Sequence, residues 1–207
     1  MSKALLIGNG DPVPADFLKR LAGAADFVLA ADGGANKAVR AGVTPRAVIG
    51  DLDSVLPQTR QACPDTQFIR VDNQNNTDLE KALDWLLEKG FTSCEIVCGV
   101  GGRWDFSIGN FLSVYPYAGK INLAFKGPGW SIYPLTRGGT FPCKPGGRVS
   151  VIPVTACPDV TLKGLKYPLE HAHLKLGGTG LTLSNEATAG RFEVSFDSGY
   201  LLVYAED

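Results

Sequence analysis

The feature that most constrains the fold is a regular alternation of strand-like and helix-like segments over roughly the first 118 residues. Apolar runs at 3–7 (KALLI) and 27–31 (FVLAA) each end in a turn that contains glycine, and a segment with helical spacing follows each turn, as at 15–25 and 35–41. Alternation of this kind is typical of βαβ units, whose strands lie parallel. The sequence therefore predicts an α/β domain with a mostly parallel sheet.

After Lys120 the pattern changes to short alternating runs that are separated by Gly, Pro, Asn and Asp. These runs are INLAFKG, WSIYPL, RVSVIPV, VTLKGL, HAHLKL, LTLSN and RFEVSF. Period-two alternation without a helical stripe predicts an antiparallel, sandwich-like all-β domain. We place the domains at residues 1–119 and 120–207.

Composition excludes several classes of protein. The 207 residues are 44% hydrophobic and carry a net charge of −1, so neither a nucleic-acid nor a membrane surface is expected. No apolar run is long enough to span a bilayer, and the N-terminus reaches glycine too soon for a signal-peptide core. Five scattered cysteines, with no C-x-x-C pair, favour buried reduced thiols and a cytoplasmic location.

Four polar clusters follow apolar runs of the first domain. They are DGGAN (32–36), GDLDS (50–54), QNNTD (74–78) and GGRWD (101–105). Ligands of parallel α/β sheets bind at the carboxyl ends of the strands, so these clusters are expected to meet at one edge. That edge would hold five carboxylates: Asp32, Asp51, Asp53, Asp78 and Asp105.

Carboxylates that share a small volume require a positive partner, and Mg²⁺ is the cation that hard oxygen ligands and phosphates prefer. Arg103 would add a fixed cation for a phosphate oxygen. Period two would point Asp51 and Asp53 the same way, with Leu52 directed into the protein. Thr77 and Glu80 form a capping box that predicts a helix from residue 78.

Other patterns leave simpler interpretations open. A lone D-x-D is also typical of a solvated loop. The first loop, GNGDP (8–12), departs from G-x-G-x-x-G, so a glycine turn is favoured there over a nucleotide loop. His171 and His173 share a strand face without a visible third ligand, which favours a solvated face over a metal site. The absence of G-x-S-x-G disfavours a serine hydrolase.

Taken together, ADGGAN (31–36), IGDLDS (49–54), QNNTDLEKAL (74–83) and GGRWDF (101–106) resemble the thiamine pyrophosphokinase family, in both order and spacing. GGRVSVIPV (146–154), GLKYPL (164–169) and LSNE (183–186) resemble that family's β domain. The resemblance implies transfer of a diphosphoryl group from ATP to thiamine, with AMP as the second product. It also implies an ATP- and Mg²⁺-binding α/β domain, a thiamine-binding β-sandwich, and a homodimer whose active site lies at the subunit contact.

The resemblance further implies roles for individual residues. The catalytic set would be Asp51, Asp53, Asp78, Lys81, Arg103 and Asp105, with Asp51, Asp53, Asp78 and Asp105 as the metal-related acids. ATP would contact Asp32, Gly33, Asn36, Gln74, Thr77 and Arg103, and Lys81 would also contact its phosphates. Ser184 and Asn185 would approach thiamine. Either Asp53 or Asp78 would accept the proton of the thiamine alcohol.

The chain departs from the family pattern at Phe106, where GGR-x-D is usually followed by histidine. Tyr200 and Tyr204 are both candidates for an aromatic that stacks on thiamine. Three other functions stay open on sequence alone. They are a haloacid-dehalogenase-type phosphatase, a diphosphokinase for another alcohol such as a pterin, and a non-catalytic thiamine-binding module.

Overall fold

The computed structural model describes residues 2–73, 75–177 and 182–207. The chain forms two compact units, residues 1–128 and 129–207, and each is described by itself. The sequence placed the boundary at 119/120, whereas the two compact units divide at 128/129. The run at 122–127 looks like its β-rich successors, but it pairs parallel with a strand of the first unit.

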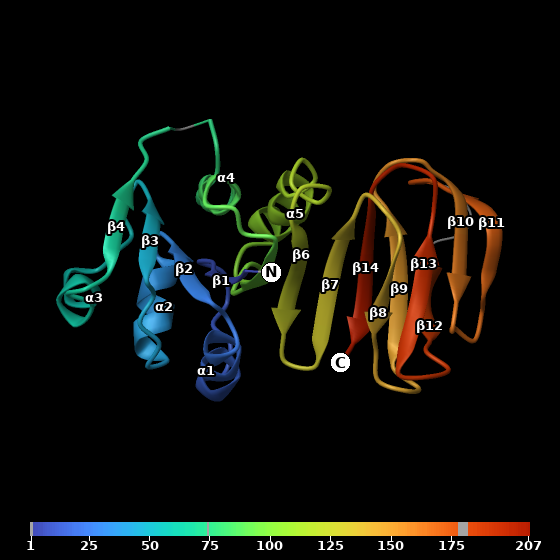
Figure 1. The fold of residues 1–207 in the computed structure, drawn as a ribbon, viewed down its shortest axis with the longest axis horizontal. Coiled ribbons are helices and arrows are strands. Elements are labelled where there is room, and N and C mark those ends of the chain that lie inside the picture. The colour runs from blue at the N-terminus through green and yellow to red at the C-terminus, as the bar shows by residue number, and fades with distance from the viewer. Residues whose placement is uncertain (1, 74, 178–181) are drawn as a thin grey trace. The chain divides into compact units, whose positions relative to one another are not determined.

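The first unit alternates strands and helices as the sequence predicts (Figure 1). Its elements are β1 (Lys3–Ile7), α1 (Ala15–Gly23), β2 (Phe27–Ala31), α2 (Gly34–Arg40), β3 (Ala47–Gly50), α3 (Pro57–Ala62), β4 (Gln67–Arg70), α4 (Asp78–Glu88), β5 (Ser93–Val97), α5 (Trp104–Ser113) and β6 (Asn122–Gly127). The strand order is β6-β5-β1-β2-β3-β4, and every neighbouring pair is parallel. The predicted parallel sheet is confirmed, whereas the short helix α3 was not predicted.

Buried side chains on alternate strand positions anchor the helices to this sheet. Leu5 and Ile7 of β1 form one core cluster with Leu18 and Leu21 of α1. On α4, Leu79, Leu83 and Leu86 are buried behind the capping box, and this helix contacts β2 and β3. The helices thereby fix the loops that leave the carboxyl ends of the strands.

The strand order places a topological switch point between β1 and β5. From β1 the chain proceeds outward through β2, β3 and β4, and β5 then returns to the other side of β1. Loops that diverge at such a point leave a crevice, which is where open α/β sheets bind ligands. The loops after β1 and β5 are therefore expected to line a site.

The second unit consists of two antiparallel sheets. Its strands are β7 (Trp130–Leu135), β8 (Gly139–Pro142), β9 (Arg148–Pro153), β10 (Cys157–Lys163), β11 (Leu169–Leu174), β12 (Thr182–Glu186), β13 (Arg191–Ser195) and β14 (Leu201–Glu206). One sheet has the order β12-β9-β14-β7 and the other has the order β11-β10-β13-β8. β8 and β14 were not predicted.

Aromatic contacts join the two sheets of the second unit. The ring of Tyr133 on β7 lies 4.7 Å from the ring of Phe141 on β8, and Phe141 lies 5.7 Å from Phe192 on β13. On β9 and β14, buried and more exposed residues alternate, so one face of this sheet is turned to a core. The sandwich-like architecture that the sequence predicts is thus confirmed.

The cysteines agree with a further expectation. All five cysteines are free and buried. None of the helices in the described parts of the chain is long and apolar enough to cross a bilayer.

Candidate active site

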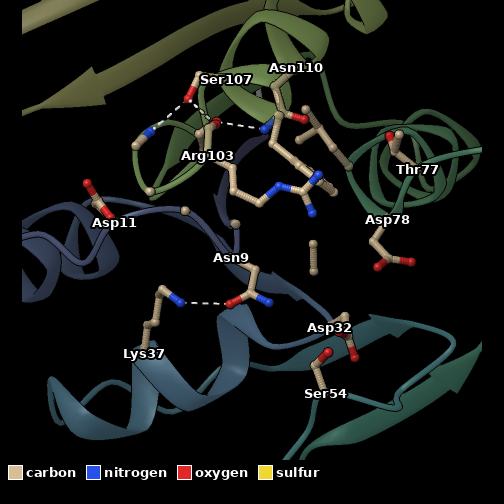
Figure 2. A pocket seen from close by; sticks show the side chains of 18 of the residues that line it. Asn9, Asp11, Asp32, Lys37, Ser54, Thr77, Asp78, Arg103, Ser107 and Asn110 are labelled. Atoms are coloured by element: carbon tan, nitrogen blue, oxygen red, sulfur yellow. Dashed lines mark hydrogen bonds between the residues drawn. The ribbon is translucent and has the colours of Figure 1, made fainter.

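A pocket of about 590 Å³ lies at the carboxyl ends of the strands of the first unit. Its lining comes from the loops after β1, β2, β3 and β5, from the start of α4, and from α2 and α5 (Figure 2). Among the described lining residues are five carboxylates and two cations. The carboxylates are Asp11, Asp32, Asp51, Asp53 and Asp78, and the cations are Lys37 and Arg103. The pocket therefore has a formal excess of three negative charges.

Three of the carboxylates form a tight group, which we call the acidic triad: Asp32, Asp51 and Asp78. Each offers one oxygen, and these oxygens all lie within 4.8 Å of one another. Asp32 is 4% exposed, and its Oδ1 has no hydrogen-bond partner in the described structure. Burial raises the pKa of the Asp32 carboxyl, and hydrogen bonds from Gly33 and Ser54 lower it by a smaller amount. A divalent cation with hard oxygen ligands would satisfy that orphaned oxygen and offset the repulsion, so these residues fit Mg²⁺.

Gly50 gives the triad its space. A Cβ at this position would lie 2.9 Å from the Cβ of Asp32 and 3.1 Å from Oδ1 of Asp78, and φ is +151°.

Strand β3 ends at Gly50, so Asp51 and Asp53 lie in a loop and not on a strand face. Leu52 packs against the core, as expected. Its φ is +66°, so a turn directs this side chain inward, and not the period-two alternation of a strand.

Asp53 lines the pocket but stands outside the triad. Its backbone N–H donates to Asp51 Oδ1 at 3.2 Å, and its Oδ1 accepts from the Ser54 hydroxyl at 2.9 Å. The side chain is exposed. It thus remains accessible to a ligand in the pocket.

Lys81 is withdrawn from the pocket surface. Its Nζ lies 2.9 Å from Asp78 Oδ1, and the lysine side chain is only 5% exposed. It is not among the lining residues that the structure describes. Its position is that of an internal counter-ion to the acidic triad, and a direct phosphate contact stays a prediction.

Arg103 is the residue before α5, and its side chain projects toward the centre of the pocket (Figure 2). Its guanidinium pairs with the carboxylate of Asp105, and its Cζ lies 4.2 Å from the centroid of the Phe106 ring. Asp105 is exposed and does not join the triad. The hydrogen bonds from Arg103 hold the pKa of the Asp105 carboxyl below its ordinary value. Phe106, where the family usually has histidine, thus occupies the pocket wall beside Arg103.

The capping box at the start of α4 is confirmed. The Glu80 N–H donates to Thr77 Oγ1 at 3.2 Å, and the Thr77 N–H donates to Glu80 Oε2 at 2.8 Å. Thr77 also lines the pocket, so one residue both fixes the helix and faces the site. Gln74, expected to contact ATP, lies outside the described residues.

Asn36 holds a neighbouring loop. Its Nδ2 donates to the Ser54 carbonyl at 2.7 Å, and its Oδ1 accepts from the Leu56 N–H at 3.1 Å and from the Thr59 hydroxyl at 2.7 Å. Asn36 is not among the described lining residues, and neither is Gly33. Each lies beside a residue that does line the pocket. Asn36 hydrogen-bonds Ser54, and Gly33 leaves room for the side chain of Asn9.

The loop after β1 has a larger role than the sequence suggested. Gly8, Asn9, Gly10, Asp11 and Pro12 all line the pocket. A Cβ on Gly10 would lie 2.4 Å from the Val100 carbonyl oxygen, so glycine lets this loop approach the loop after β5. The glycine-turn interpretation therefore describes the local packing, but it missed that the turn is a wall of the site.

Four further lining residues were missed: Lys37, Gly99, Ser107 and Asn110. Ser107 Oγ accepts from the Gly101 N–H at 2.9 Å, and Asn110 Nδ2 donates to the Gly99 carbonyl at 2.6 Å. Both side chains brace the loop after β5 from α5. Only the strand order, with β5 beside β1, could have indicated them in advance.

The residues predicted to bind thiamine lie in the second unit. Asn185 is buried on β12, where its Oδ1 accepts from the Tyr167 N–H at 3.0 Å and its Nδ2 donates to the Tyr167 carbonyl at 2.7 Å. Ser184 is exposed and has φ of +58°. Of the two aromatic candidates, Tyr200 is 1% exposed and belongs to the core, whereas Tyr204 is half-buried.

The two histidines do not form a metal site that the described residues support. His171 Nδ1 lies 2.6 Å from Asp159 Oδ1, and no group of three ligating residues includes either histidine. The favoured interpretation, a solvated strand face, agrees with the exposure of His171 and His173.

Comparisons with known proteins address the family directly. Residues 18–125 match the thiamin pyrophosphokinase catalytic domain, and residues 142–201 match the thiamin pyrophosphokinase vitamin B1 binding domain. The chain is 33% identical to a thiamine pyrophosphokinase of Bacillus subtilis over 171 residues. This aligned region covers 79% of each protein. The chain belongs to the thiamin pyrophosphokinase family.

Solved structures of thiamin pyrophosphokinases share the whole fold. The Bacillus subtilis enzyme superposes with a TM-score of 0.84 at 28% identity, covering 99% of each chain. The Geobacillus thermodenitrificans enzyme gives 0.85 at 27% identity, covering 100% of this chain and 98% of the other. The catalytic-domain match begins at residue 18, so the pocket loop after β1 lies outside it.

Proposed function

We propose that this chain is an ATP- and Mg²⁺-dependent thiamine diphosphokinase, which transfers a diphosphoryl group to the hydroxyl of thiamine and releases AMP. The observation that carries the proposal is the pocket, in which the acidic triad and Arg103 face one cavity at the carboxyl ends of the parallel strands. Membership of the thiamin pyrophosphokinase family supports the choice of substrates.

Asp32, Asp51 and Asp78 would hold Mg²⁺. Bound there, the ion would neutralise charge on the phosphate oxygens of ATP. Diphosphoryl transfer requires mainly positioning and charge neutralisation, and Arg103, which projects into the pocket, would contribute to the latter. Thiamine carries a cationic thiazolium, so the negative excess of the pocket also favours that substrate.

We assign the proton acceptor to Asp53. The alcohol of thiamine loses a proton as it attacks phosphorus, and a carboxylate within reach can accept it. The other candidate, Asp78, has Lys81 at its Oδ1 and belongs to the triad. Asp53 faces the same pocket, is exposed and has only a serine hydroxyl at its Oδ1. The Asp53 carboxylate is thus the better placed of the two.

The substrate side is assigned to the second unit, with Ser184 and Tyr204 as contacts and Asn185 as the support of the adjacent loop. The described lining residues of the pocket all lie between positions 8 and 110. We therefore propose a homodimer in which the second unit of the partner approaches the pocket. A stripe of exposed apolar residues on and just after α5 supports a partner surface: Trp104, Ile108, Leu112 and Tyr115.

The activity test incubates the protein with ATP, Mg²⁺ and thiamine, and follows AMP and thiamine diphosphate. Stoichiometric formation of both is the expected result. Formation of ADP, or AMP without dependence on thiamine, would overturn the proposal, and a panel of other alcohols separates thiamine from a pterin. Asp51→Asn and Asp78→Asn should each lower turnover more than about tenfold, the equivalent of about 1.4 kcal/mol in transition-state stabilisation.

The dimer is tested by light scattering on the wild type and on Ile108→Glu. A charge in the centre of the apolar stripe should shift a dimeric mass to that of a monomer. A wild-type mass of 22 kDa at micromolar concentration would contradict the homodimer.

A further inference from the structure

Phosphate recognition uses cationic donors, and Arg103 is one such group in this pocket. The family resemblance implied that Lys81 contacts the phosphates, but Lys81 is 5% exposed and is paired with Asp78. The other cation in the described lining is Lys37, in the last turn of α2.

Lys37 is held in place by a neutral group. Its Nζ donates to Asn9 Oδ1 at 2.7 Å, and it takes part in none of the ion pairs among the described residues (Figure 2). An ammonium group has three donors, so this bond orients the group and leaves donors for a ligand. An amide oxygen also leaves the positive charge intact, in contrast to the carboxylate beside Lys81.

Asn9 lies close to the start of α2. A Cβ on Gly33 would lie 2.4 Å from Asn9 Nδ2, so glycine at position 33 leaves room for the Asn9 side chain in this position. Asn9, Lys37 and Gly33 thus connect the loop after β1 to α2. This connection sets the position of a positive charge at the pocket wall.

The acidic triad and Lys37 lie on different sides of the pocket, and Asp11 is a further carboxylate on the side of Lys37. In Figure 2 the Arg103 guanidinium lies centrally, and Lys37 and Asp78 project from opposite sides. A polyphosphate chain can be held through a metal ion at one end and through ammonium and guanidinium groups at the other. We propose that Lys37 binds phosphate oxygens of the nucleotide and that Asn9 is its positioning residue. The proposal rests on the proposed use of ATP.

Binding measurements test this role without thiamine. Titration calorimetry with ATP and Mg²⁺ compares the wild type with Lys37→Met, Asn9→Asp and Arg40→Met. Lys37→Met should raise the Kd for ATP about tenfold, the equivalent of about 1.4 kcal/mol. Arg40→Met is the matched control, because it removes one positive charge from the exposed end of the same helix, outside the pocket lining. Its Kd should stay within about twofold of the wild type.

Asn9→Asp separates positioning from charge. The carboxylate keeps an oxygen for Lys37 Nζ, but it neutralises the ammonium, so ATP affinity should fall although the contact survives. A purely structural role of Asn9 predicts unchanged affinity in Asn9→Asp. Thermal unfolding confirms that each variant is folded, and Lys37→Arg, which keeps the charge, should restore part of the affinity lost in Lys37→Met.

The outcomes distinguish this proposal from the proposed function. Wild-type ATP affinity in Lys37→Met overturns the role of Lys37, even where the enzyme makes thiamine diphosphate normally. Weakened ATP binding in Lys37→Met and Asn9→Asp supports it, even where the wild type fails to use thiamine. In steady-state assays the change should appear in KM for ATP more than in KM for thiamine.

Discussion

Lys81 Nζ lies 2.9 Å from Oδ1 of Asp78, three residues earlier on α4, and the lysine side chain is almost fully buried. A buried ammonium group beside one member of the acidic triad stabilises the charge of that group before any metal ion arrives. A buried charge of this kind depends on its partner, because removal of either member leaves the other unpaired. The pair therefore links the stability of α4 to the electrostatics of the site.

Lys81→Met should lower the free energy of unfolding by about 2 kcal/mol in the absence of divalent cations, the scale of a lost hydrogen bond between charged groups. Because the triad then carries one more uncompensated negative charge, Mg²⁺ should raise the melting temperature by more than in the wild type. Thermal unfolding with and without Mg²⁺ measures both effects. A variant that is as stable as the wild type without Mg²⁺ would show that the pair contributes nothing.

Asp32→Asn should separate stability from metal binding. Asp32 is buried with an unpartnered oxygen, so the loss of its charge removes repulsion within the triad. Asparagine also tolerates the positive φ of +41° at this position. The expected result is a melting temperature at or above the wild-type value without Mg²⁺, together with loss of most of the Mg²⁺-dependent increase.

Asp105→Asn is the matched control for this variant, since Asp105 is exposed and outside the triad. It should retain the Mg²⁺-dependent increase in melting temperature. An undiminished increase in Asp32→Asn would remove Asp32 from the metal site.

Gly50→Ala tests whether the triad needs the space that glycine leaves. The added Cβ would approach Asp32 and Asp78 closely, at a backbone conformation that L residues rarely adopt. We expect turnover below about a tenth of the wild type, the scale of a lost contribution of 1.4 kcal/mol. Gly90→Ala is the control, because Gly90 also has positive φ but has open space around it.

Gly90→Ala should cost about 1 kcal/mol of stability from backbone strain and leave turnover unchanged. Circular dichroism melting and the AMP assay together distinguish strain from intrusion. Equal turnover in the two alanine variants would contradict the steric role of Gly50.

The sequence predicted most of the sheet because its strands are short apolar runs that end in polar loops, and the helices because of features such as the Thr77–Glu80 capping box. It misplaced β6, since a strand of alternating pattern does not reveal whether its partner is parallel β5 or an antiparallel strand. It brought Asp32, Asp51 and Asp78 together correctly, because all three follow strands at one edge.

The sequence could not predict which residues act through a neighbour. Asn36 belongs to a motif of the first unit, but its amide is used by Ser54, Leu56 and Thr59. Lys37 has no pattern of its own, and in the pocket its Nζ donates to Asn9 of the loop after β1. Such contacts depend on tertiary packing between β1 and α2, which periodicity does not encode.

His171 provides a pH-dependent interaction that can be measured alone, because the chain has only two histidines. The carboxylate of Asp159, 2.6 Å from Nδ1, raises the pKa of His171, and Glu170 adds a smaller contribution. The pKa is raised in the folded state, so the pair stabilises the fold fully below the unfolded-state pKa. That contribution is lost as the pH rises through the higher folded-state pKa.

In a His173→Gln background, an NMR titration of the remaining ring should give a midpoint above that of an unfolded peptide. Asp159→Asn should lower the midpoint, and Glu170→Gln should lower it less. A midpoint that does not respond to Asp159→Asn would show that the contact does not persist in solution.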